Sequence, residues 1–133
     1  MRLHKISASV LAACICFVAF TNSAQATFCR SYEQTSSNAG DCPDCQLSIM
    51  NFPQEQAYAV HASNGWQAEL NYVEGDSSVA TGGGRWRKGL PHAYAGRDFD
   101  LDLTQQGKTL SMVMSTIIDG HRQVIRAEFR CTG

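Results

Sequence analysis

The sequence has no excess of basic residues, since 11 Lys and Arg stand against 12 Asp and Glu. Nucleic acids and anionic membrane surfaces attract proteins with a clear basic excess, so neither is expected as the main partner. The sequence also lacks a run of the ~20 apolar residues that a membrane-spanning helix requires. Its longest mostly apolar run, Ile6 to Phe20, is shorter and lies close to the N-terminus. We therefore predict no nucleic-acid partner and no transmembrane segment.

That early apolar run instead fits a secretory signal peptide. It follows a positive start containing Arg2 and Lys5, and the small-x-small end at Ala26 is typical of a cleavage site. Cleavage there leaves 107 residues, enough for one domain, with 9 Lys and Arg against 12 Asp and Glu because Arg2 and Lys5 are lost. Lipoprotein processing at Cys14 is an alternative. The chain is predicted to be exported, to the periplasm or the cell exterior.

Few cysteines remain after the signal, and their even number indicates a disulfide framework in a short exported chain. They are Cys29, Cys42, Cys45 and Cys131. Three pairings are open, and each of them joins Cys131 to the N-terminal segment and leaves the other bridge local to that segment. We expect three parts in the chain: a signal peptide at 1–26, a turn-rich cysteine-containing N-terminal arm at 27–46, and a β-barrel-like domain at 47–133.

The run Cys42-Pro43-Asp44-Cys45 could also serve redox or metal chemistry. A thioredoxin-like site needs a helix N-terminus to lower the thiol pKa, whereas a strand-like segment, QLSIMNF, follows here. Asp41 and Asp44 would raise that pKa. A zinc site would need further Cys or His ligands at pair spacing. We favour a structural disulfide, with no metal and no cofactor, and keep a thiol-disulfide or metal-binding role as the alternative.

No convincing helical periodicity occurs after residue 26, but short runs with period-two alternation do, separated by Gly, Asn and Asp. Two-residue turns at Gln106-Gly107 and Asp119-Gly120 would place Phe99 opposite Met114, and Met114 opposite Ile125. One face of three strands is then continuously apolar.

A third turn, at Asn64-Gly65, predicts a hairpin in the middle of the chain. It would set the apolar face that contains Trp66 and Leu70 against Ala59 and His61. The fold predicted is all-β: a single small antiparallel meander of about seven strands, closed as a barrel and stapled by disulfides, with a β-sandwich as the alternative.

The segment GGGRWRKGLPHAYAGR gathers basic and aromatic residues in a chain that is otherwise acidic. Arginine and exposed aromatic side chains are enriched among residues that anchor binding, and a loop between strands is where a β-scaffold displays a site. The segment is no phosphate-binding loop, since Gly-x4-Gly-Lys-Ser/Thr is absent. The opposing interpretation is that Trp86 belongs to the core and the charges solubilise a loop. The candidate binding residues are Arg85, Trp86, Arg87, Lys88, His92, Tyr94 and Arg97.

Catalytic patterns are scarce. No serine lies in Gly-x-Ser-x-Gly, and no second motif accompanies His61, His92 or His121. We therefore favour a non-enzymatic binding or inhibitory module that presents the basic and aromatic loop, or the barrel mouth, to a protein, a glycan or a small apolar ligand. A hydrolase that uses His61 or His92 with a carboxylate, and a structural protein of the cell envelope, are the alternatives.

Overall fold

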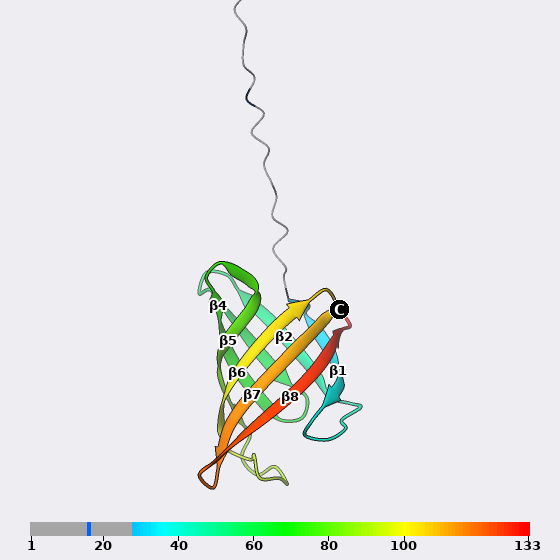
Figure 1. Ribbon diagram of the computed structural model, residues 1–133, viewed down its shortest axis with the longest axis vertical. Coiled ribbons are helices and arrows are strands. Elements are labelled where there is room, and N and C mark those ends of the chain that lie inside the picture. The colour runs from blue at the N-terminus through cyan, green and yellow to red at the C-terminus, as the bar shows by residue number, and fades with distance from the viewer. Residues whose placement is uncertain (1–15, 17–27) are drawn as a thin grey trace, which may run out of the picture.

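The computed structural model describes Cys16 and residues 28–133, so the expected signal peptide lies outside the described residues, apart from the exposed Cys16. Eight strands pair with their sequence neighbours, all antiparallel, and β1 also pairs with β8, so the predicted barrel is confirmed over a sandwich (Figure 1). No helix in the described part has the length and apolar character needed to cross a bilayer. The strands are β1 (Ser31–Ser37), β2 (Gln46–Phe52), β3 (Ala57–Ala62), β4 (Trp66–Val73), β5 (Asp76–Trp86), β6 (Asp98–Gln106), β7 (Thr109–Ile118) and β8 (His121–Cys131).

The strand that closes the barrel, β1, lies inside the arm that was expected to be rich in turns. Its sequence, SYEQTSS, has a single apolar residue, Tyr32, which is fully buried. Tyr32 pairs with Leu47 of β2 on one side and with Cys131 of β8 on the other. A strand whose other side chains are polar gives almost no alternation signal, which explains why about seven strands were predicted and eight are present.

The hairpin registers in the last third are partly confirmed. The β7–β8 pairing is as predicted, with Met114 opposite Ile125. The β6–β7 pairing is shifted by two residues, so Leu101 rather than Phe99 lies opposite Met114, because the turn is made by Gly107 and the following residue. A shift of two residues keeps every side chain on its predicted face, whereas a shift of one would reverse the faces.

The β3–β4 hairpin shows the effect of a one-residue shift. Leu70 lies opposite Tyr58, not Ala59, because three residues and not two separate the strands. Tyr58 and Val60 therefore point into the barrel, and His61 is exposed on the outer surface. The placement of His61 on an apolar face was wrong.

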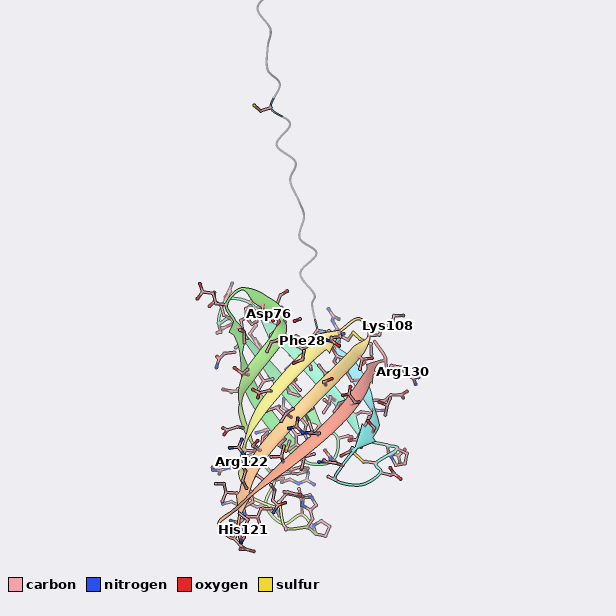
Figure 2. All side chains as sticks on the ribbon, viewed as in Figure 1. Phe28, Asp76, Lys108, His121, Arg122 and Arg130 are labelled. Atoms are coloured by element: carbon pink, nitrogen blue, oxygen red, sulfur yellow. A yellow bond between two sulfur atoms is a disulfide. The ribbon has the colours of Figure 1, made fainter. Side chains whose placement is uncertain are left out.

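One end of the barrel is closed by covalent and polar contacts, and we call it the closed end. Cys29 and Cys131 form a disulfide there. The Tyr32 hydroxyl accepts a hydrogen bond from the Cys29 main-chain N–H at 2.7 Å and donates one to the buried side chain of Gln105. Burial raises the pKa of Tyr32 to about 12. Phe28 lies at the same end (Figure 2). Its ring packs edge-on against that of Tyr58, with 5.0 Å between the ring centroids.

A candidate binding cavity at the barrel mouth

The opposite end, which we call the mouth end, is hollow. The connections 38–45, 63–65, 87–97 and 119–120 all lie there, because alternate turns of a meander fall at the same end (Figure 1). His121 and Arg122, at the start of β8, mark this end in Figure 2. A cavity of about 360 Å³ opens between the loops 38–45 and 87–97, which we call the rim loops. We call it the mouth cavity.

The walls of the mouth cavity are made by inward-facing side chains of the strands. Most are apolar and buried in the barrel core. The polar and charged residues of the lining are Gln34, Ser37, Asp41, Gln46, Asn64 and His92. The apolar wall residues from the strands are Leu47, Trp66, Trp86, Met112, Met114, Ile125 and Phe129.

Aromatic rings gather around Trp86, which ends β5. Tyr94 stacks on it with the ring planes 27° apart, and His92 meets it edge-on with centroids 5.0 Å apart. Trp86 is 5% exposed, and its indole Nε1 is buried without a hydrogen-bond partner among the described residues. A buried donor left unpaired lowers the free energy of unfolding by about 1 to 3 kcal/mol, and the indole N–H of Trp86 carries this cost.

The first rim loop carries the second disulfide, which joins Cys42 to Cys45. Both cysteines line the mouth cavity, and Cys45 is buried. Main-chain bonds fix the end of the loop: the Gln34 N–H donates to the Cys45 carbonyl oxygen at 2.9 Å, and the Cys45 N–H donates to that of Cys42 at 3.1 Å. The strand β2 begins directly after Cys45, in place of the helix that would activate a thiol.

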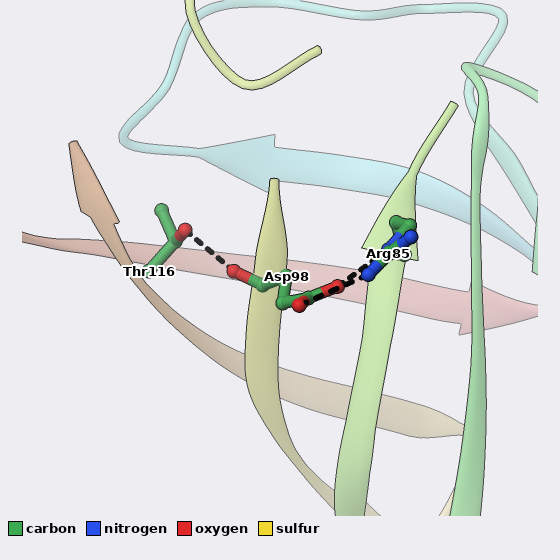
Figure 3. A network of polar contacts seen from close by, with 3 residues as sticks. All are labelled: Arg85, Asp98 and Thr116. Atoms are coloured by element: carbon green, nitrogen blue, oxygen red, sulfur yellow. Dashed lines mark hydrogen bonds and ion pairs between the residues drawn. The ribbon is translucent and has the colours of Figure 1, made fainter. Parts of the chain in front are cut away.

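The second rim loop is held at its stem by polar contacts across β5, β6 and β7. Arg85 Nε donates to Asp98 Oδ1 at 2.6 Å, and Thr116 donates to the Asp98 main-chain oxygen at 2.7 Å (Figure 3). The hydrogen bond between the side chains raises the pKa of Arg85 and lowers that of Asp98. Because both ion-pair partners are well exposed, the pair contributes little to stability. It orients the loop stem.

The structure separates the seven candidate binding residues into two groups. Trp86, His92 and Tyr94 line the mouth cavity. The four basic residues of the segment are exposed and do not line it. They are Arg85, Arg87, Lys88 and Arg97. Whether any of the seven binds a partner stays a prediction.

Sequence reasoning offered the barrel mouth as a binding surface, but it placed several of the cavity residues in the core and assigned none of them to a site. Met114 and Ile125 were assigned to the apolar face, and the Cys42–Cys45 run was interpreted as a structural disulfide. The signal that was missed is β1. Once that strand is counted, the loop that follows it and the 87–97 loop fall at the same end of the meander.

These features define a class of protein: a closed eight-stranded antiparallel barrel that is sealed at one end and hollow at the other. Among the described residues, no group of three His, Cys, Asp or Glu side chains is placed to hold a metal ion. Comparisons with protein-family models, curated proteins and solved structures find no significant match to this chain.

Proposed function

We propose that this protein is an exported, non-enzymatic binding protein that holds a small apolar molecule in the mouth cavity. The carrying observation is the cavity of about 360 Å³, walled mainly by apolar side chains that include the rings of Trp66 and Trp86. Small-molecule sites are concave, mostly apolar, about 300 to 1,000 Å³ in volume, and contain a few polar groups. An eight-stranded barrel has an interior that can hold one small ligand.

We choose among a protein, a glycan and a small molecule as the ligand from the residues that line the mouth cavity. Glycans present many hydroxyl groups and would need many polar partners, whereas most of the strand residues that line the cavity are apolar. A protein partner would meet the exposed rim and not the buried rings below it. A small apolar ligand is the only one of the three that would use the buried walls.

The cellular location of the protein is also part of the proposal. Two disulfides are compatible with an oxidising, exported environment. Together with the predicted signal peptide they support export, to the periplasm or the cell exterior. A ligand carrier or scavenger in that compartment needs no catalytic group, in keeping with the scarcity of catalytic patterns.

The proposal is tested with the uncharged dye N-phenyl-1-naphthylamine, whose emission rises in apolar surroundings. We expect saturable binding of one dye per chain of residues 27–133. The variant Gln34→Trp should abolish it, because Gln34 lines the cavity and a larger ring there fills the space. The readout is a titration of dye emission at constant protein concentration.

The matched control is Ser36→Trp, two residues along the same strand, where the side chain is exposed and does not line the cavity. This variant should bind the dye as the unmodified chain does. Equal dye binding by all three proteins would place the dye elsewhere, and absence of binding to the unmodified chain would contradict the proposed function.

A further inference from the structure

The lining of the mouth cavity changes from apolar to polar toward its opening, which indicates a ligand class on the condition that the proposed function holds. We infer that the ligand is a cationic amphiphile, with an apolar body inside the barrel and one positively charged amine group that stays at the opening beside Asp41. Three features of the cavity support this: the separation of apolar and polar lining residues, the charge of Asp41, and the position of the basic side chains.

The polar lining residues gather at the opening. The apolar side chains that the strands contribute are all buried, with exposed fractions of 7% or less. Four of the six polar or charged lining residues are exposed, at the start of β2, in the β3–β4 turn and in the two rim loops: Gln46, Asn64, Asp41 and His92. A molecule that fills the cavity therefore meets apolar walls with its body, and polar side chains and water with its outer end.

Asp41 determines which charge is favoured at that outer end. It is the only Asp or Glu in the lining, the lining contains no Lys or Arg, and Asp41 forms no ion pair within the described part of the chain. Because Asp41 is exposed, an ammonium group can approach its carboxylate without leaving water, and the large cost of burying a charge does not arise. A carboxylate accepts strong, charge-assisted hydrogen bonds from such a group.

The basic residues of the second rim loop do not reverse this preference. Arg87, Lys88 and Arg97 are exposed and do not line the cavity. Exposed charges at a distance act weakly, because salt screens them beyond about 8 to 10 Å. The first rim loop contains Asp44 in addition to Asp41, and no basic residue. The charge that a bound molecule meets at the lining is therefore negative.

The test compares three probes that share a naphthalene ring and differ in the group attached to it. At neutral pH 1-naphthylmethylamine is a cation, 1-naphthylmethanol is uncharged and 1-naphthoate is an anion. Binding to residues 27–133 is measured by titration calorimetry at low salt. We expect the amine to bind about threefold to fivefold more tightly than the alcohol, the effect of one exposed ion pair, and the anion to bind most weakly. Added salt should reduce the difference.

In Asp41→Asn the preference for the amine over the alcohol should disappear. The matched control is Asp44→Asn, in the same loop, where the side chain is exposed but does not line the cavity, and this variant should keep the preference. Both replacements exchange an exposed carboxylate for an amide of the same shape, so neither is expected to disturb folding.

Loss of the preference in both variants would overturn the assignment to Asp41. If the unmodified chain binds the amine and the alcohol equally, or binds the anion most tightly, the ligand class is wrong but the small-molecule site stands. If none of the three probes binds up to its solubility, the proposed function fails and the inference fails with it.

Discussion

Replacement of Cys29 and Cys131 by alanine should lower the free energy of unfolding by about 4 to 5 kcal/mol, because the disulfide spans 102 residues and restricts the unfolded chain. A domain of this size has a total stability of about 5 to 15 kcal/mol, so the variant should lose between about a third of that stability and nearly all of it. The measurement is denaturant unfolding of residues 27–133 under non-reducing conditions.

The matched control is the pair Cys42 and Cys45, replaced in the same way. Their disulfide spans only 3 residues, and the chain-entropy relation gives it about 2 kcal/mol. The two double variants should therefore differ by more than a factor of two in lost stability. Equal losses would contradict the view that the long cross-link seals the closed end and dominates stability.

The second large effect is expected at Gly82, in the middle of β5. It pairs with Leu70 and Leu101, two inward-facing residues. A Cβ atom there would lie 2.2 Å from the Glu69 main-chain oxygen and 2.9 Å from the Leu70 Cα. These are main-chain atoms that cannot rotate away, so Gly82→Ala must separate β4 from β5. We expect a loss of about 3 kcal/mol or more in the free energy of unfolding.

The neighbouring Gly83→Ala serves as the control. Gly83 is exposed, and a Cβ atom there would lie 3.1 Å from the Phe99 main-chain oxygen, which requires only a small adjustment. Alanine also reduces the freedom of the unfolded chain, which offsets part of that cost. Gly83→Ala should therefore stay within about 1 kcal/mol of the unmodified chain. A loss as large as that of Gly82→Ala would show that side-chain direction is not the cause.

The sequence was sufficient to predict the fold class because alternation and turn residues are strong in β6, β7 and β8. The Asp119-Gly120 turn fixed the β7–β8 register correctly. Turn chemistry was less reliable where the loop length could be read in two ways. At Asn64-Gly65 one additional loop residue reversed the face assigned to β3, although the alternation itself was recognised.

The site was harder to predict because the cavity exists only once the strands have closed into a barrel. Met114 and Phe129 look like ordinary core residues in the sequence, and only the closed barrel shows that they line the mouth cavity. The loop with Cys42 and Cys45 lies far from Trp86 in the sequence, and the two lie at one cavity because β1 closes the barrel. The weak alternation of β1 was the missing step.

The central claim is that a small apolar molecule enters the mouth cavity. The methionine methyl groups of residues 27–133 test it most directly, because Met112 and Met114 line that cavity whereas Met50 is 51% exposed on the outer surface. With carbon-13 labelled methyl groups and added naphthalene, we predict shifted signals for Met112 and Met114 and an unchanged signal for Met50. A shift confined to Met50, which lies beside the exposed Phe52, would place the ligand on the outer surface and contradict the account.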